Sequence, residues 1–448
     1  MDACKVLLLP FYCDGYDREI AASQIAQTAD FLRTCGMEVT TAETIETAAQ
    51  AYCAAKTYNP YCYDLPVLLP VTWSEPRLAA IAARQFFGLP MAIVCVREFL
   101  YKGRRTEMSS TPAAAALRGS LQEMGVSCEF FPDLPQTEQD AKRFRALAAA
   151  ARAVRVLRTA KLGFFGHNFN GITAADFDLS LLRRRFGTEV YSFDVSELLA
   201  RMNALDKESE AWKQTAETVK QKIHGKTGKY GEKIIRMTLA LRQYVEEYGL
   251  DALAVRCHTE LSQTYGLTAC LPLGILGDEL PCSCEADLPV TLTQLLLSAL
   301  SGGKTTLYAD LRTFHEDGID AASCGYAPCA LTGGRAEVGG QEAPECATGP
   351  GYLTNKNGLS EGRVTMARML KFPGGKLALH LTEGTAKAEP SYLQEYGCPY
   401  YPMAKITPDL PMAQFLEYVG ANHYAVVYDE LAEAAKLFCK YTGVEYIG

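Results

Sequence analysis

Two acidic residues, Glu260 and Asp287, stand where predicted strands end. Glu260 follows residues 253–255, whose apolar run predicts a buried strand, and Asp287 closes the polar break 282–287, which leads into the apolar helical run 292–300. Open α/β sheets bind ligands where strand ends face helix starts. Two carboxylates at adjacent strand ends repel each other unless a cation or a shared proton lies between them. The two acids could therefore form a metal site or an acid/base pair.

Both acids also have a purely structural interpretation. Glu260 could cap the helix that follows it. In Asp287-Leu288-Pro289 the aspartate could be an N-cap with proline in the first helical turn. The residues alone leave both interpretations open.

Histidines and amides supply the other candidates for this site. Histidine often joins acids as a ligand when the metal is manganese or a similar ion. His423 lies in the turn 420–424, which enters a predicted strand, although a lone histidine there could equally be structural. The candidates for substrate binding are polar residues that follow predicted strands or neighbour the candidate ligands: His167, Asn168, His258 and Asn422.

The sixteen cysteines are scattered along the chain, many of them inside apolar runs. Disulfides are rare in reducing compartments, and the chain shows no secretion signal, so we expect free thiols. Cys282 and Cys284 lack the two-residue gap and the second pair of a zinc site. We therefore expect these thiols not to hold a metal.

Composition and charge narrow the classes of partner. The 448 residues carry a net charge of −8, whereas a nucleic-acid footprint needs a basic face. No apolar run reaches the roughly 18 residues that a membrane span requires. The N-terminal residues enter a predicted strand directly, without a signal-peptide pattern. We expect a cytoplasmic protein with neither a nucleic-acid nor a membrane partner.

The order of the predicted elements indicates three domains. Residues 1–155 alternate strands and helices, which implies a parallel sheet, and residues 156–324 repeat this pattern and carry the acidic candidates. In residues 325–448, glycine, proline and threonine increase and short alternating runs appear, which predicts an antiparallel β domain or barrel. An amphipathic helix over residues 429–441 ends this domain.

The motifs around the two acids resemble the L-fucose/L-arabinose isomerase family, most closely its fucose-isomerase-like branch. The resemblance is good from about residue 160 onward and mainly architectural before it. The matching segments, in chain order, are 254–261, 284–287, 292–293, 295–302, 308–311, 324–328 and 362–365, and 422–425 is similar to the family's late histidine turn.

This resemblance implies an aldose–ketose isomerase with a divalent cation, usually Mn²⁺, held by Glu260, Asp287 and His423. It also implies two Rossmann-like parallel-sheet domains followed by a C-terminal antiparallel β-barrel domain. Trimers or hexamers, with sites near subunit boundaries, are expected as well. One departure bears on the substrate, because relatives often have histidine where this chain has Ser323.

The chemistry expected from the resemblance is transfer of a proton between neighbouring sugar carbons through an enediol, with Glu260 and Asp287 as base and acid. The expected substrate is a free deoxy-hexose or pentose. Two alternatives are a non-catalytic sugar-binding or sensing protein and an isomerase of a modified, anionic sugar, whose charge Arg104 and Arg105 could meet.

Overall fold

The computed structural model describes residues 3–132, 137–168, 171–257, 261–322, 325–338, 353, 355, 357–388 and 403–448. His258, Glu260 and Ser323 lie outside the described residues. The chain divides into two compact units, one formed by residues 1–156 and 433–443 and the other by 157–432 and 444–448. The domain boundaries expected after residues 155 and 324 stay predictions.

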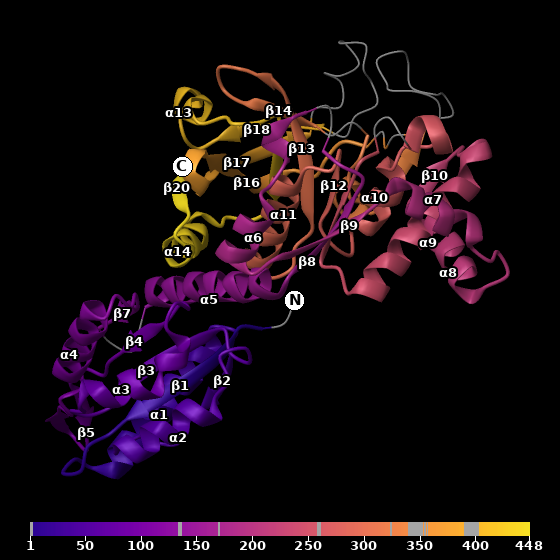
Figure 1. Cartoon of the computed structure of the whole chain (residues 1–448). Helices are drawn as coiled ribbons and strands as arrows, with labels where there is room; N and C mark the ends of the chain where they lie inside the picture. Colours follow the sequence, from indigo (N-terminus) through magenta and orange to yellow (C-terminus); the bar gives the residue numbers. More distant parts are fainter. Residues whose placement is uncertain are drawn as a thin grey trace. The chain divides into compact units, whose positions relative to one another are not determined.

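The first unit contains a five-stranded parallel sheet in the order β2-β1-β3-β4-β7 (Figure 1). Alternate residues of β1 face opposite sides, so that Val6 and Leu8 join one apolar cluster and Leu7 and Leu9 another. Because both faces are covered, the strands are apolar without alternation. The strands are β1 (Lys5–Phe11), β2 (Glu38–Thr41), β3 (Leu65–Pro70), β4 (Ala92–Val94) and β7 (Glu129–Phe131).

Helices on both faces also contribute residues to these clusters. They are α1 (Arg18–Thr34), α2 (Ala48–Thr57), α3 (Pro76–Ala82), α4 (Ser110–Glu123), α5 (Glu138–Thr159) and, from the end of the chain, α14 (Ala432–Thr442). Arg104 and Arg105 lie on an exposed hairpin of β5 (Phe99–Tyr101) and β6 (Arg104–Thr106), where Arg105 pairs with Glu98 at 3.1 Å. This hairpin therefore carries the two arginines considered for an anionic sugar.

The second unit begins with a four-stranded parallel sheet in the order β12-β11-β8-β9. Its strands are β8 (Lys161–Phe165), β9 (Glu189–Phe193), β11 (Ala252–Val255) and β12 (Cys282–Cys284). Its helices are α6 (Leu179–Phe186), α7 (Val195–Ala204), α8 (Glu210–Lys222), α9 (Gly231–Tyr248), α10 (Cys270–Leu276) and α11 (Leu288–Leu300). Every residue of α11 is buried, including the polar Thr291, Thr293 and Gln294, so this helix lies inside the unit.

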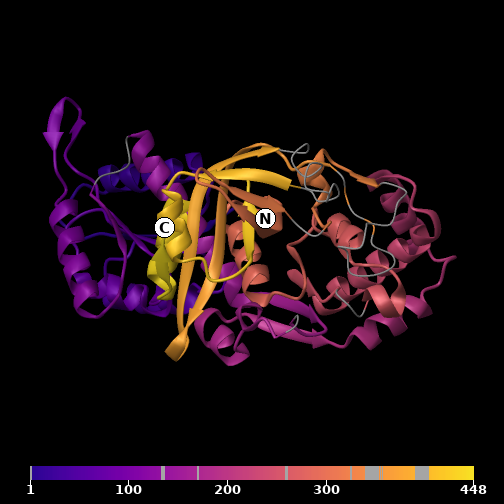
Figure 2. The same ribbon diagram turned by 90° about the horizontal axis from the view of Figure 1, so that it is seen from above.

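A closed six-stranded antiparallel barrel follows, in the order β16-β19-β13-β14-β18-β17, and pairing of β16 with β17 closes it. Figure 2 shows its long strands in orange and yellow. The strands are β13 (Thr306–Phe314), β14 (Ile319–Ala322), β16 (Gly362–Phe372), β17 (Lys376–Ala388), β18 (Met403–Pro408) and β19 (His423–Val427). Two of them, β13 and β14, precede residue 325, so the barrel draws on more of the chain than its predicted domain.

Three smaller features complete the second unit. Strand β20 (Glu445–Ile447) pairs with β17 in parallel, outside the closed barrel. Strands β10 (Ile223–Gly225) and β15 (Ala336–Val338) form a two-stranded parallel sheet, and α13 (Met412–Glu417) precedes β19. The predicted class, two parallel α/β sheets and a C-terminal antiparallel barrel, is confirmed.

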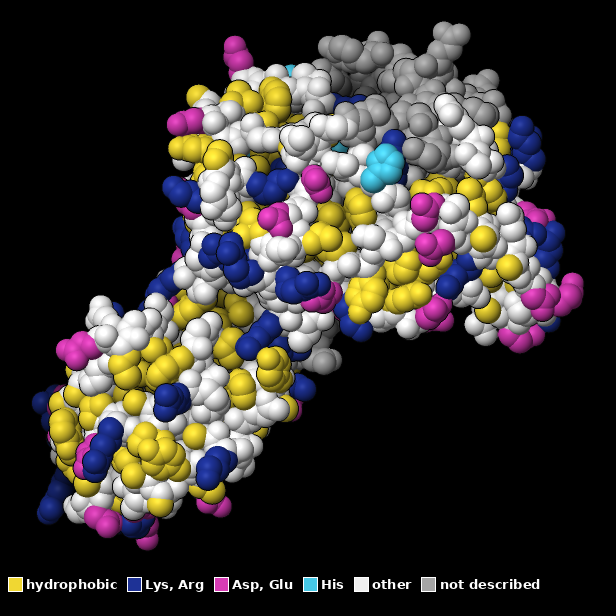
Figure 3. Space-filling model, in the orientation of Figure 1, with side chains coloured by type: hydrophobic (Ala, Val, Ile, Leu, Met, Phe, Trp, Pro, Cys, Tyr) yellow, Lys and Arg dark blue, Asp and Glu magenta, His cyan; other side chains and the backbone are white. Residues whose placement is uncertain are grey.

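Two observations bear on the expected partners. Among the described residues, no helix combines the length and the apolar composition needed to cross a membrane. On the face shown in Figure 3, acidic and basic side chains are interspersed rather than gathered into a basic patch. Nothing on that face indicates nucleic-acid binding.

Candidate metal centre

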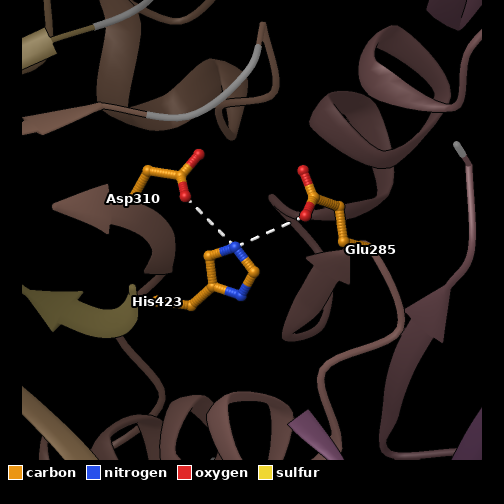
Figure 4. Close-up of side chains that lie close together, drawn as sticks. All are labelled: Glu285, Asp310 and His423. Carbon is orange, nitrogen blue, oxygen red and sulfur yellow. Dashed lines mark ion pairs between the residues drawn. The ribbon is translucent and has the colours of Figure 1, made fainter. Parts of the chain in front are cut away.

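Three side chains of the second unit converge where the parallel sheet meets the barrel: Glu285, Asp310 and His423 (Figure 4). One ligand atom of each lies within 4.8 Å of the other two. His423 Nε2 is 3.1 Å from Asp310 Oδ1 and 3.5 Å from Glu285 Oε2. Two carboxylates and one imidazole nitrogen form a donor set that suits a divalent cation.

The barrel register places two of these residues opposite each other. Asp310 of β13 and His423 of β19 are direct cross-strand partners in an antiparallel pair. Glu285 comes from the other side, since it follows β12 of the parallel sheet. The three residues form one cluster, which we call the triad, because the end of β12 faces this pair of barrel strands.

The backbone after β12 adopts an uncommon conformation. Glu285 and the adjacent Ala286 have φ of 64° and 54°, in the left-handed region that non-glycine residues rarely occupy. Each such residue costs of order 1 kcal/mol or more and clusters at functional sites. The turn brings Glu285 to the Nε2 side of His423 and Asp287 to its Nδ1 side.

Asp287 contacts His423 at Nδ1, the ring nitrogen on the opposite side from the triad. Its buried carboxylate accepts from His423 Nδ1 at 2.9 Å, from the two terminal nitrogens of Arg368 at 3.0 and 3.3 Å, and from the backbone N–H of Val290 at 3.0 Å. Burial raises the pKa of Asp287, but Arg368 and His423 outweigh it and keep the pKa below its usual value. The ionised carboxylate therefore accepts the Nδ1 proton.

These four contacts fill the acceptor sites of the carboxylate, which has about four. The N-cap interpretation of Asp287 is confirmed by its bond to Val290. A carboxylate that accepts the second ring proton of a ligating histidine is the usual orienting partner in metal sites. The expected role of Asp287 as a ligand stays a prediction, and its contacts favour a positioning role.

The charges around His423 fit a cation. Burial lowers the pKa of His423, but Asp287, Asp310 and Glu285 outweigh it and raise the pKa well above its usual value. Burial raises the pKa of Asp310, whereas His423 and Arg312 lower it, and the result lies below the usual value. The ionised carboxylates of Asp287 and Asp310 thus face the His423 ring. This ring attracts a proton or, in place of that proton, a metal cation.

The remaining site candidates lie in two places. The Nδ2 of Asn422 is 2.8 Å from His423 Nε2 and 3.2 Å from Asp310 Oδ1, so this amide borders the triad. His167 and Asn168 follow β8, where a terminal nitrogen of Arg256 lies 2.7 Å from His167 Nε2 and 3.4 Å from the Asn168 carbonyl oxygen. Their roles in substrate binding stay predictions, as do those of His258 and Glu260, which lie outside the described residues.

Glu285 and Asp310 lie in the segments 284–287 and 308–311 that carry the family resemblance, but the sequence analysis gave neither residue a role. Asp310 ends the predicted strand 305–309, and Glu285 lies in the polar break before Asp287. A signal was available for Asp310, which directly follows the apolar residues 307–309, whereas Glu285 lies in a polar break without such a run.

Comparison with known proteins supplies the chemical class. No protein-family model matches the chain. It is 25% identical over 299 residues to a sulfoquinovose isomerase of Alkalicoccus urumqiensis, a match that spans 66% of each chain. It is 19% identical over 388 residues, 84% of each chain, to the sulfoquinovose isomerases of Priestia aryabhattai and Priestia megaterium. These relatives confirm the prediction of an isomerase, which is an intramolecular oxidoreductase.

Binding of a divalent ion at the triad is expected to weaken as the pH falls. The raised pKa of His423 means that its ring stays in the doubly protonated, cationic form over a wide pH range in the ion-free protein. A ligating imidazole must be neutral, so each bound ion displaces that proton, and the affinity is expected to fall about tenfold per pH unit below this pKa.

Chelator competition across a pH series measures how the affinity for the ion depends on pH. The same competition in two buffers of different ionisation enthalpy measures the number of protons released. His315→Asn is the control, because His315 pairs with Asp320 at 2.8 Å outside the triad and its loss should leave the slope unchanged. An affinity that is the same at every pH would contradict the expectation.

Proposed function

We propose that the chain is a metal-dependent aldose–ketose isomerase whose substrate is an anionic sugar of the sulfoquinovose type. The observation that carries this proposal is the triad of Glu285, Asp310 and His423, with His423 oriented by Asp287. Sugar binding alone needs no such set of metal ligands. Of the two substrate classes expected from the sequence, the names of the relatives favour the anionic sugar over a neutral deoxy-hexose or pentose.

Each residue of the site has a separate role in the proposed reaction. A divalent ion, Mn²⁺ by the family resemblance, would supply stabilisation of the negative charge that develops on two adjacent sugar oxygens. Glu285 and Asp310 fix the charge of the site, and Asp287 keeps the His423 ring in one tautomer and one orientation. Asn422, whose amide donates to Asp310 Oδ1 at 3.2 Å, would offer this amide to a sugar oxygen bound at the triad.

The proton transfer needs a base next to the sugar carbons. We assign this role to Glu260, which would take the proton from carbon 2 and return it to carbon 1 of the enediol. Asp287 is engaged by Arg368 and His423, so in this proposal it positions His423 and does not exchange protons with the sugar. A homo-oligomer of this chain, a trimer or a hexamer, remains part of the proposal.

The test is incubation of the purified chain with sulfoquinovose in D₂O, with Mn²⁺ added or removed by a chelator. The matched control is 6-deoxyglucose, which lacks only the sulfonate. The expected result is interconversion of sulfoquinovose with its ketose, deuterium at the carbon that receives the proton, loss of both on chelation and much slower reaction of the control.

Two results would contradict the proposal in different ways. Turnover of 6-deoxyglucose at the same rate as sulfoquinovose would refute the anionic substrate class. Tight binding of sulfoquinovose and of the metal without any interconversion would identify a sugar-binding protein instead.

A further inference from the structure

Two buried thiols lie against each other next to the triad. Cys257 and Cys284 are 2% and 0% exposed, and their Sγ atoms are 2.8 Å apart. No disulfide joins them, so each carries a thiol. A disulfide bond is about 2.05 Å long, so the two sulfur atoms would have to approach by less than about 1 Å to form one.

The parallel sheet explains why the two thiols meet. Cys284 is the last residue of β12 and pairs with Val255, the last residue of the neighbouring strand β11. Cys257 lies two residues beyond Val255. Cys257 is therefore not the register partner of Cys284, and the two side chains meet beyond the paired ends of the strands. The distance of 2.8 Å between the two sulfur atoms is the observation that makes a bond between them feasible.

We propose that Cys257 and Cys284 form a redox-modification site that hydrogen peroxide converts to a disulfide. One thiolate attacks a peroxide oxygen, so that an S–O bond forms, the O–O bond breaks and the leaving hydroxide takes a proton to give water. The second thiol then attacks this sulfur, the S–S bond forms, the S–O bond breaks and a second water leaves. Two electrons pass from the thiols to the peroxide.

Oxidation of this thiol pair would affect the metal centre, because Cys284 is directly followed by Glu285 of the triad. Glu285 is joined directly to Cys284 and occupies the left-handed backbone region, with φ of 64°, so a shift of the Cys284 backbone is transmitted to a residue with little conformational freedom. A movement of Cys284 toward Cys257 would displace the Glu285 carboxylate. A misplacement of about 1 Å in a catalytic site lowers turnover about 100-fold.

This effect on turnover rests on the proposed isomerase function, whereas formation of the disulfide does not. The full-length chain is treated with hydrogen peroxide, its remaining thiols are alkylated and its peptides are identified by mass spectrometry. We expect one cross-linked peptide pair that joins Cys257 to Cys284 and is lighter than the two thiol peptides by two hydrogen atoms. Dithiothreitol should remove the link.

Bound divalent metal, measured on the same samples after dialysis, should fall on oxidation and recover after reduction. Cys257→Ser should keep its metal in peroxide. Cys282→Ser is the matched control, since Cys282 is equally buried on β12 and its loss should leave the response intact. Replacement of the exposed Cys13, Cys53 and Cys62 by serine should leave it intact as well.

Recovery of Cys257 and Cys284 as alkylated thiols after peroxide treatment would overturn the proposal, and so would an unchanged metal content in the cross-linked protein. The peptide map uses the natural sequence, so it decides the question even where Cys257→Ser fails to fold. A cross-link with metal loss in a protein without isomerase activity would support the redox site while refuting the proposed function.

Discussion

Replacement of Asp310 by asparagine is expected to lower isomerase activity about 1000-fold and to remove the bound divalent metal. Asparagine keeps the size of the side chain and abolishes its charge. The triad then has one carboxylate where it had two, and Asp310 Oδ1, 3.1 Å from His423 Nε2, no longer attracts a cation. A bound metal supplies several kcal/mol of transition-state stabilisation, and about 4 kcal/mol corresponds to this factor.

The measurement combines kcat/KM for sulfoquinovose with the metal content of the dialysed protein. Asp320→Asn is a matched control, because Asp320 is a buried barrel aspartate that also pairs with a histidine, His315, at 2.8 Å. It should keep both metal and activity. Full metal content in Asp310→Asn would refute the role of Asp310 as a ligand and favour the set of Glu260, Asp287 and His423 expected from the family resemblance.

Local patterns in the sequence were sufficient for the class of the fold. Strands that alternate with helices over residues 1–155 predict a parallel sheet, and the run from Val6 to Leu9 is apolar without alternation because both faces of β1 are covered. Asp287 followed by Pro289 marks the start of α11, as the structure shows. These features depend on neighbours within a few residues, and the chain displays them directly.

Pairing between distant segments decided what the sequence did not display. Asp310 becomes a partner of His423 only through the antiparallel register of β13 and β19, and no local pattern encodes that register. Glu285 reaches the same place through two consecutive residues with positive φ, Glu285 and Ala286, neither of which is a glycine that would mark the turn. Sequence reasoning therefore found the region of the site and His423, while the other two members of the triad depended on tertiary structure.

The same limit applies to Arg368, which sequence reasoning did not single out. It lies in the alternating run of β16 and reads as an ordinary strand residue. In the structure it is 1% exposed and donates to Asp287, to the carbonyl oxygen of His423 at 2.6 Å and to that of Ala174 at 2.6 Å. One guanidinium thus joins the carboxylate that orients His423 to the backbone of β19.

Replacement of Arg368 by methionine is expected to reduce the free energy of unfolding by about 3–5 kcal/mol, because it leaves the buried charge of Asp287 without its main partner. Urea unfolding measures this loss. Arg363→Met on the same strand is the control: Arg363 pairs with Asp409 and Glu430 at the exposed surface, and such pairs contribute about 1 kcal/mol or less. Equal losses in the two variants would contradict the structural role of the buried pair.

The dependence of this loss on pH provides an independent check. The pKa of Asp287 is held below its usual value in the folded protein, so its ionisation stabilises the fold above the pKa of the unfolded chain, and this contribution disappears as the pH falls through the folded pKa. Without Arg368, burial is opposed by fewer charges and the pKa of Asp287 should rise. The difference in unfolding free energy between the natural chain and Arg368→Met should therefore narrow from neutral to acidic pH.

The double variant Asp287→Asn/Arg368→Met should regain part of the lost stability, because it no longer buries an unpaired carboxylate.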